Sequence, residues 1–583
     1  MCIRDSSGSS PTTRSSTPVT TTPTAAVWWA PPEIVACDGD APSLLLITID
    51  ALRADRLGSN GSPRPTTPHL DAFAADATRF AAAFAGGPKT IPSVPQILTG
   101  NYFYWHRPVR GLGGLLGDGA LPSHAIVNNP YVAGWLRGEQ PGFAAVHAAE
   151  LDAHAITSAA LRYLTSAGRC PTALFLHYLD THTPYRAPAR FARRFIDRKA
   201  VTTIGLTFDD VTKAWQEQYG SADRQRIIDL YDGNVAYADH EVGRLLRGLA
   251  KRGRLDRTLV VITADHGEEL WDHRKFFHGQ SLFDELLHVP LLVRWPTRGH
   301  GRVVTDVVRT VDLVPTIAET LGRAPPPGDG RSLAALVDGS DAATAANAER
   351  VAFALVSHAE PRTPERQAVR TATRKLIRDV SDGALQIYDL VADPREKRNL
   401  GTAAPGAAEL ETLLTGFRRQ LDGKGHQLRL RGRADRPVRY ALDLATEPPL
   451  PVIAIDRLTL EPGDLVDFKQ RTSAFSLLGT LAPGDEDQVR FDVIGTTGVL
   501  RIAVRFDGVA AADGTIRIGA DGAAVGSAVD LADTRLDGAP RAAPSGDGPV
   551  VELWRASALP KVTAAPSLDD GTRERLRQLG YAE

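Results

Sequence analysis

Thr258–Gly279, with the sequence TLVVITADHGEELWDHRKFFHG, decides the fold of this chain. Leu259–Thr263 is an unbroken run of apolar and β-branched residues, which predicts a strand buried on both faces in a parallel sheet flanked by helices. The polar residues that follow it are Asp265, His266, Glu268 and Glu269. Ligand sites of open α/β sheets form at the carboxyl ends of strands, so this order predicts a site. Taken alone, a solvated acidic turn is an equally good explanation.

Two further buried strands are predicted to end in polar residues. Leu44–Ile49 (LLLITI) runs directly into Asp50. In Ala173–Tyr185 (ALFLHYLDTHTPY) an apolar run is followed by His177, Asp180 and His182. A lone histidine is usually structural, but two within six positions at a strand end support metal or anion binding as well as they support a structural role.

Gly86–Gly100 (GGPKTIPSVPQILTG) is a turn rich in Gly, Pro and hydroxyl residues that leads into a predicted helix at Val94–Leu98. Taken alone, Thr90 is best explained as a helix cap. The same position also faces any anion that binds the backbone N–H groups and the positive end of that helix. Thr90 is therefore a candidate nucleophile beside an anion site.

Two other helices are predicted to serve packing. Thr66-Thr67-Pro68 supplies an N-cap and a first-turn proline to a predicted helix in which Leu70, Phe73, Ala77 and Phe80 follow at helical spacing. Arg226–Leu249 has apolar residues on one face at helical spacing, which places Asp239 and His240 on its solvated side.

Composition excludes several classes of protein. The chain has 583 residues and a formal net charge of -2, so it has room for more than one domain and lacks the basic excess of nucleic-acid binding. No apolar run is long enough for a transmembrane segment. The three cysteines are spaced neither as a disulfide framework nor as a cysteine zinc site. The oligomeric state stays open.

Seven motifs follow one another along about residues 43–405. They are LITIDALRADRLG, TTPHLDAFAADATRF, TIPSVPQILTG, HYLDTHTPY, YDGNVAYADHEVGRLL, ITADHGEEL and IYDLVADPREKRNL. Together they resemble the sulfatase family of the alkaline phosphatase superfamily. The resemblance implies a metal-dependent hydrolase of ester bonds with an alkaline-phosphatase-like fold, in which a largely parallel central sheet is flanked by helices.

The resemblance also implies a role for each candidate residue. Thr90 falls on the nucleophile position, the first residue of the box Thr90-Ile91-Pro92-Ser93. The expected metal ligands are Asp50, Thr90, Asp265 and His266. The expected substrate-binding residues are His177, Asp180, His182 and His278. His182 and His278 match the family's residues that hold the substrate oxyanion, so with Thr90 they are the expected catalytic residues.

Departures from the family pattern bear on the metal and the reaction. Ala51 stands where many sulfatases have a second acid, His266 where they often have Asn, and Val94 where the box usually has Arg. One fewer hard oxygen and one more imidazole favour zinc or manganese as the divalent metal, with calcium as the alternative.

Thr90 itself cannot be converted to formylglycine. A hydrated aldehyde expels sulfate by collapse of its second hydroxyl, whereas an esterified threonine must be released by attack of water on the central atom. Phosphorus accepts this second in-line attack more readily than sulfur, so Thr90 favours a phosphate mono- or diester as substrate. The alternatives are a sulfuric ester hydrolase, a transferase that passes a phosphoryl-linked group to a glycan or lipid, and a non-catalytic binding protein.

Composition shifts predict four segments. Residues 1–42 are expected to be a disordered Ser/Thr/Pro-rich leader or linker, 43–424 the catalytic domain, 425–560 a β-rich, sandwich-like domain and 561–583 a tail with a helix. Gly495–Gly498 and Asp521-Gly522 predict hairpins within the β-rich domain. A small-molecule, glycan or lipid ester is the expected substrate. Export to the periplasm or the extracellular space is expected from the habits of the family and from the leader.

Overall fold

The computed structural model describes residues 41–556, except for 103–110, 118–120, 139–141, 149–150, 197–203, 206, 217–218, 339–349, 357–365, 381, 419–424, 448–451, 458–464, 468–473, 494–497 and 542–547. The expected leader up to residue 40, the hairpin turn at 495–497 and the tail at 561–583 lie outside the described residues, and the domain limits stay predictions. Among the helices of the described part, none is both long and apolar enough to cross a membrane.

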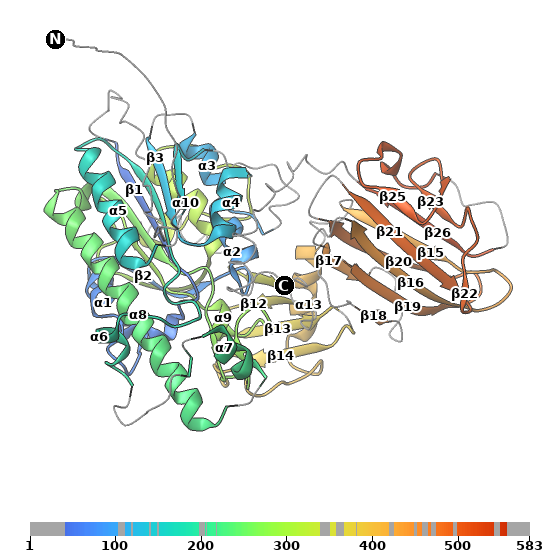
Figure 1. Cartoon of the computed structure of the whole chain (residues 1–583), viewed down its shortest axis with the longest axis horizontal. Coiled ribbons are helices and arrows are strands. Elements are labelled where there is room, and N and C mark those ends of the chain that lie inside the picture. Colours follow the sequence, from blue (N-terminus) through green and yellow to red (C-terminus); the bar gives the residue numbers. More distant parts are fainter. Residues whose placement is uncertain are drawn as a thin grey trace, which may run out of the picture. The chain divides into compact units, whose positions relative to one another are not determined.

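An eight-stranded sheet organises the first half of the described chain (Figure 1). In spatial order its strands are β10 (Val303–Arg309), β2 (Thr78–Phe84), β9 (Leu291–Arg294), β6 (Thr258–Thr263), β1 (Ser43–Ile49), β5 (Ala173–Tyr178), β3 (Ser123–Val127) and β4 (Ala145–Ala148). Neighbours run parallel except where β9 pairs with β2 and β6. The predicted, largely parallel α/β sheet is confirmed.

Successive side chains of β1 enter two different apolar cores, because side chains alternate across a strand. Leu45, Ile47 and Ile49 belong to one core, and Leu44 and Leu46 belong to the other. The first core packs on α1 (Pro68–Ala75), α5 (Ala153–Ser166), α6 (Ala189–Ala192), α7 (Phe208–Trp215) and α8 (Ser221–Lys251). The second packs on α2 (Thr90–Thr99), α3 (Gly111–Leu116), α4 (Pro130–Gly138), α10 (Leu313–Thr320) and α11 (Ala334–Asp338). The sheet is thus covered by helices on both faces (Figure 1).

A smaller antiparallel sheet follows in the chain. It consists of β11 (Ala352–Val356), β12 (Arg366–Arg370), β13 (Arg374–Asp379) and β14 (Leu385–Asp389), and α13 (Ala407–Arg418) packs on it. A hairpin of β7 (Glu269–Leu270) and β8 (Phe276–Phe277) and the short helix α9 (Asp284–Leu287) lie between the sixth and ninth strands in sequence. The hairpin and α9 both follow the end of β6 in the chain.

The C-terminal strands form two packed sheets, as predicted. One contains β17 (Val452–Arg457), β20 (Glu486–Val493), β15 (His426–Arg431), β26 (Val550–Arg555), β23 (Ile516–Ile518) and β24 (Ala523–Val525). The other contains β18 (Leu465–Asp467), β19 (Ala474–Leu481), β16 (Val438–Glu447), β21 (Val499–Phe506), β22 (Val509–Ala510) and β25 (Ala528–Asp530). Phe475 and Phe491, one from each sheet, meet edge to face at 5.3 Å in a shared core. The turn at Asp521-Gly522 joins β23 and β24 as expected.

Two sequence expectations about the packing helices are wrong. Asp239 on α8 is 1% exposed rather than solvated, and its carboxylate accepts hydrogen bonds from the backbone N–H groups of His69 and Leu70. Thr67 is the N-cap residue of α1 and Pro68 begins the helix, as expected, although the Thr67 side chain makes no capping bond. The helix ends at Ala75, however, and Phe80, which was expected on it, lies in strand β2. Asp239 provides the acceptors that the first turn of α1 needs, and helical periodicity cannot reveal such a contact because it comes from another element. Cys170 forms a disulfide bond, which the spacing of the cysteines in the sequence did not predict.

Candidate functional site

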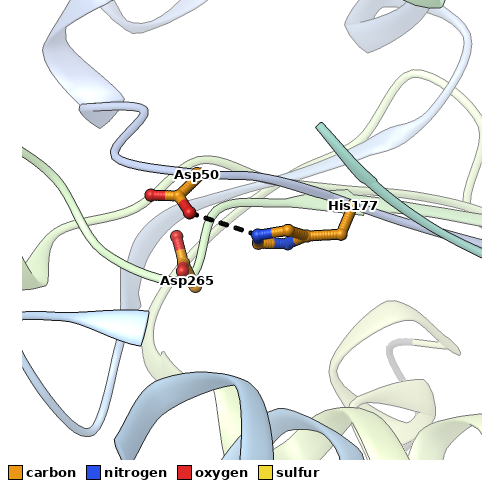
Figure 2. Close-up of side chains that lie close together, drawn as sticks. All are labelled: Asp50, His177 and Asp265. Atoms are coloured by element: carbon orange, nitrogen blue, oxygen red, sulfur yellow. Dashed lines mark hydrogen bonds and ion pairs between the residues drawn. The ribbon is translucent and has the colours of Figure 1, made fainter. Parts of the chain in front are cut away.

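Three strand ends bring the candidate site together. Strand β1 lies between β5 and β6, with Thr48 in register with His177 on one side and with Thr263 on the other. The carboxyl ends of these parallel strands therefore meet at one edge of the sheet. Figure 2 shows that the side chains of Asp50, His177 and Asp265 converge there.

Asp50, His177 and Asp265 are fully buried and each offers one ligand atom within 4.8 Å of the other two. The Nε2 atom of His177 lies 3.1 Å from Oδ2 of Asp50. On the other side of the ring, Nδ1 of His177 lies 2.7 Å from the hydroxyl of Thr48, and that hydroxyl donates to the carbonyl of Leu176 at 3.4 Å. The Thr48 hydroxyl can therefore accept from Nδ1–H, which leaves Nε2 as a metal-binding nitrogen.

His266 adds a second imidazole to the same cluster. Its Nε2 lies 3.5 Å from Oδ1 of Asp50 and 3.6 Å from Oδ2 of Asp265. Its Nδ1–H donates to the carbonyl of Gly267 at 2.8 Å, so the lone pair of Nε2 faces the two carboxylates. Gly267 permits this arrangement, because a Cβ atom at that position would lie 2.0 Å from the carbonyl oxygen of Glu285.

The electrostatics of the cluster favour a cation. Burial alone would raise the pKa of Asp50, but the hydrogen bond to His177 and the charges of nearby imidazoles lower that pKa well below its usual range. Burial and the charge of Asp50 raise the pKa of Asp265. Burial opposes protonation of His266, but Asp265 and Asp50 outweigh it and raise the pKa of that imidazole. A positive charge between these groups is thus stabilised.

The donor set also has the chemistry that a divalent metal requires. Oδ1 of Asp50 and Oδ2 of Asp265 accept no hydrogen bond from the described residues, although both are buried. Neither carboxylate is paired with a lysine or an arginine in the described part of the chain. Buried carboxylate oxygens without a donor are costly unless a cation binds them. Together with two imidazole nitrogens they fit zinc or manganese.

Thr90 is the first residue of α2 and is fully buried at the edge of this cluster. Its Oγ1 lies 3.3 Å from Oδ2 of Asp50, to which it donates, and 3.4 Å from Nε2 of His266. The structure thus brings together all four predicted metal-binding residues. The hydroxyl also lies at the helix end whose backbone N–H groups attract anions.

Two more histidines approach from the loops after β5 and β8. The ring of His278 lies 4.5 Å from that of His266 and 4.8 Å from that of His182. Nδ1 of His278 is 2.9 Å from a carboxylate oxygen of Glu268, whose other oxygen accepts from the hydroxyl of Tyr185 at 3.1 Å. Burial and the charge of His266 hold the pKa of His278 well below its usual value, and burial lowers that of His182. Both predicted oxyanion residues therefore lie beside the cluster.

Two expected substrate residues are placed differently from the rest. Nε2 of His177 faces Asp50, so this residue joins the metal-binding candidates instead of the substrate edge. The carboxylate of Asp180 accepts from the N–H of Ala153 at 3.0 Å, at the start of α5, and its carbonyl accepts from Asn234. These hydrogen bonds join Asp180 to α5 and α8, and neither of them reaches the cluster of Asp50, His177 and Asp265. The sequence signal for His177 was its place at the end of an apolar run, and the signal for Glu268 was its place two residues after His266.

Comparisons with known proteins show which family and fold the chain resembles. The family model described as Sulfatase matches residues 42–113 and 109–323, and the model described as N-sulphoglucosamine sulphohydrolase, C-terminal, matches residues 271–422. The chain is 26% identical over 431 residues to an ulvan-active sulfatase of Formosa agariphila, which covers 66% of this chain and 80% of the relative. It is 29% identical over 267 residues to a choline-sulfatase of Rhizobium meliloti, covering 43% of this chain and 50% of the relative.

Solved structures extend the comparison to the fold. The phosphonate monoester hydrolase of Silicibacter pomeroyi is similar with a TM-score of 0.53 and 22% sequence identity, over 65% of this chain and 95% of that protein. At this level of identity the similarity concerns the fold alone.

Proposed function

The chain belongs to the sulfatase and alkaline-phosphatase-like superfamily of ester hydrolases, and from this premise we propose that it hydrolyses a phosphate ester through Thr90. The observation that carries the proposal is the place of the Thr90 hydroxyl, 3.3 Å from Asp50 and 3.4 Å from His266 at the N-terminus of α2. A hydroxyl nucleophile needs a group that lowers its proton affinity and a place for the charge that develops on its target. Thr90 has both.

Asp50, His177, Asp265 and His266 would hold the divalent metal, with zinc or manganese favoured by the two imidazoles. When bound, the cation would lower the proton affinity of the Thr90 hydroxyl and offset negative charge on the transferring group. Thr48 and Gly267 orient the two imidazoles through their second nitrogens.

The residues of the chain perform two steps. In the first, Oγ1 of Thr90 forms a bond to phosphorus while the bond from phosphorus to the leaving oxygen breaks, and the proton of the Thr90 hydroxyl ends on that oxygen, which departs as the alcohol. The N–H groups at the start of α2 bind the equatorial oxygens. In the second, water attacks phosphorus and the bond to Thr90 breaks. His278, whose lowered pKa keeps its ring neutral and whose Nδ1 lies 2.9 Å from Glu268, takes the proton of that water at Nε2 and returns it to Oγ1 of Thr90. His182 borders the same transferring group.

Sulfate ester hydrolysis is the second candidate. It is favoured by the relatives, whose names describe sulfatases acting on ulvan and on choline sulfate. Hydrolysis of a phosphate ester is favoured by Thr90. Release from an esterified threonine requires attack on the central atom, which phosphorus accepts more readily than sulfur. A small-molecule or glycan ester fits either reaction.

The test compares matched aryl phosphate, bis-aryl phosphate and aryl sulfate esters. Enzyme stripped of metal and reloaded separately with zinc, manganese or calcium is assayed as wild type and as Thr90→Ala. We expect phosphate turnover that falls by at least about 10³-fold in Thr90→Ala, because a nucleophile is removed. Thr99→Ala, at the other end of α2, where the hydroxyl bonds only to the carbonyl of Pro95 and the N–H of Asn101, is the matched control and should stay active. Full activity of Thr90→Ala would contradict the proposal. If the wild type prefers the aryl sulfate, sulfate ester hydrolysis is the function instead.

A further inference from the structure

Ala51, the residue after Asp50, has a φ of 55°, in the left-handed region that residues with a Cβ atom rarely adopt. It is fully buried. Alanine has no polar side chain, and it is the local hydrogen bonds of such side chains that let asparagine and aspartate adopt this region. Contacts with other parts of the protein must therefore hold the turn after β1 in this conformation. Backbone strain of this kind is found mainly where it positions functional groups.

The hydroxyl of Tyr231, on α8, closes this turn. It donates to the carbonyl of Ala51 at 2.7 Å and accepts from the N–H of Arg53 at 3.0 Å. Burial raises the pKa of Tyr231, so the phenol keeps the proton that it donates. Its ring is fully buried and packs edge to face against that of Tyr185, with 5.6 Å between the ring centroids. One side-chain oxygen of fixed position thus satisfies two buried backbone groups of the turn.

The conformation of Ala51 also determines where its own N–H points. This N–H donates to Oδ1 of Asp265 at 3.2 Å, and the N–H of His266 donates to the same oxygen at 2.9 Å. The other oxygen of Asp265, Oδ2, lies 3.6 Å from Nε2 of His266. The turn after β1 therefore links the neighbour of Asp50 to the carboxylate of Asp265, and it fixes which oxygen of Asp265 faces the metal-binding cluster.

We infer that Tyr231 is a positioning residue: its hydroxyl holds Ala51 in the left-handed conformation, which sets the orientation of the Asp265 carboxylate toward the divalent metal. The inference rests on the proposed function, because it concerns the metal ligands proposed there. Residues that orient metal ligands without binding the metal commonly change its affinity by 10- to 100-fold. Tyr231 acts through the backbone of Ala51, so its effect is on the affinity for the metal.

The experiment uses the full chain with Tyr231→Phe, which removes the hydroxyl and keeps the ring, alone and combined with Ala51→Gly. Glycine adopts the left-handed conformation without the steric cost that alanine has. Tyr237→Phe is the matched control, because Tyr237 is also a buried tyrosine of α8, and its hydroxyl bonds the N–H of His154 at 3.2 Å and Asp152 at 3.0 Å. The readouts are the Kd of zinc, measured against a competing chelator, and the thermal unfolding of the metal-free proteins.

Tyr231→Phe should weaken zinc binding roughly 10- to 100-fold. In the presence of Ala51→Gly, the same change should weaken zinc binding by less than about threefold, because the left-handed conformation then depends less on the hydroxyl. Tyr237→Phe should leave the zinc affinity unchanged, even where it lowers the thermal midpoint as much as Tyr231→Phe does. A purely structural role of the Tyr231 hydroxyl would lower the midpoint without this change in Kd.

An unchanged Kd in folded Tyr231→Phe would overturn the inference, and so would an equal loss of affinity in Tyr237→Phe or in the presence of Ala51→Gly. If Tyr231→Phe does not fold, the double variant decides. A double variant that folds and binds zinc supports the inference, and one that does not fold or does not bind zinc overturns it. Zinc binding does not require turnover, so a wild type that binds zinc and cleaves no ester would refute the proposed function, whereas the inference about Tyr231 depends on the zinc measurements alone.

Discussion

Two buried clusters of charged side chains differ in how the free-energy cost of burying charge is offset. In the first, around Asp284, each carboxylate meets a permanent cation. Lys375 lies 2.7 Å from Asp284 and 2.8 Å from Glu396, and Arg370 lies 3.2 Å from Asp284. In the second, around Asp50, two carboxylates meet imidazoles but no lysine or arginine of the described chain, and one oxygen of each accepts no hydrogen bond there.

This difference in charge pairing distinguishes a cluster that supports the fold from a cluster that is suited to bind a ligand. A buried pair that is complete adds little net free energy, but loss of one partner leaves an uncompensated charge. A buried cluster that is short of positive charge is unfavourable by itself, and such strain is characteristic of sites that bind a ligand. The Asp284 cluster joins α9 to the small antiparallel sheet, whereas the Asp50 cluster lies where β1, β5 and β6 end and faces Thr90.

The largest expected effect is that of Asp265→Asn. The amide keeps the acceptor for the N–H groups of Ala51 and His266, and it places its NH₂ where the carboxylate oxygen has no donor. We expect esterase activity to fall by at least about 10³-fold with loss of bound metal. In metal-free protein the thermal midpoint should stay the same or rise, because repulsion between Asp50 and Asp265 is removed.

Metal analysis, activity and thermal unfolding with and without chelator check this outcome. A metal-free variant that unfolds several degrees below the wild type would contradict the view that the Asp50 cluster is unfavourable by itself. The comparison between the clusters would then fail.

The opposite pattern is expected for Lys375→Met in the paired cluster. Lys375 is fully buried, so its removal leaves Glu396 without this cation and Asp284 with Arg370 in its place, and it should cost about 3–5 kcal/mol of unfolding free energy. The folded fraction should keep its activity within about threefold, since the ion pairs of Lys375 are with Asp284 and Glu396 and not with the residues around Thr90. Urea unfolding followed by assay below the transition measures both. An activity loss larger than the loss of folded protein would show that the two clusters are coupled.

The sequence predicted the sheet and most of the site because both follow from local patterns. Apolar runs ending in Asp50, His177 and Asp265 indicated three strand ends, and the parallel order of β5, β1 and β6 then brings those ends together. Chain order alone does not say which strands are neighbours. For that reason His177 was expected at the substrate and is found beside Asp50.

The other features that the sequence did not predict are contacts between segments that are distant in the chain. The carboxylate of Asp239 lies at the start of α1, and Lys375 pairs with Asp284 and Glu396 across two elements. Neither contact leaves a periodic signal in the sequence, because each depends on how separate elements pack.

The smallest expected effect concerns the pH dependence at the rim of the paired cluster. His273 lies 2.5 Å from Glu285 and 3.0 Å from the carbonyl of Glu396. Burial opposes protonation of His273, but the hydrogen bond and charge of Glu285 raise its pKa above the ordinary value of 6.5. Its contribution to stability is therefore complete below that value and is lost as pH rises through the raised pKa of the folded protein.

His273→Gln keeps a donor toward Glu285 without the charge. It should destabilise the protein at pH 5.5 by less than about 1 kcal/mol, because the ring is partly solvated, and by a smaller amount at pH 9. His69→Gln provides a control of opposite sign, since burial and Arg247 lower the pKa of His69, so this variant should gain relative stability as pH falls. Thermal midpoints across this pH range decide the matter. If the loss of stability in His273→Gln instead grows with pH, His273 is neutral in the folded protein. The charge pairing found around Asp284 would then not include His273 and Glu285.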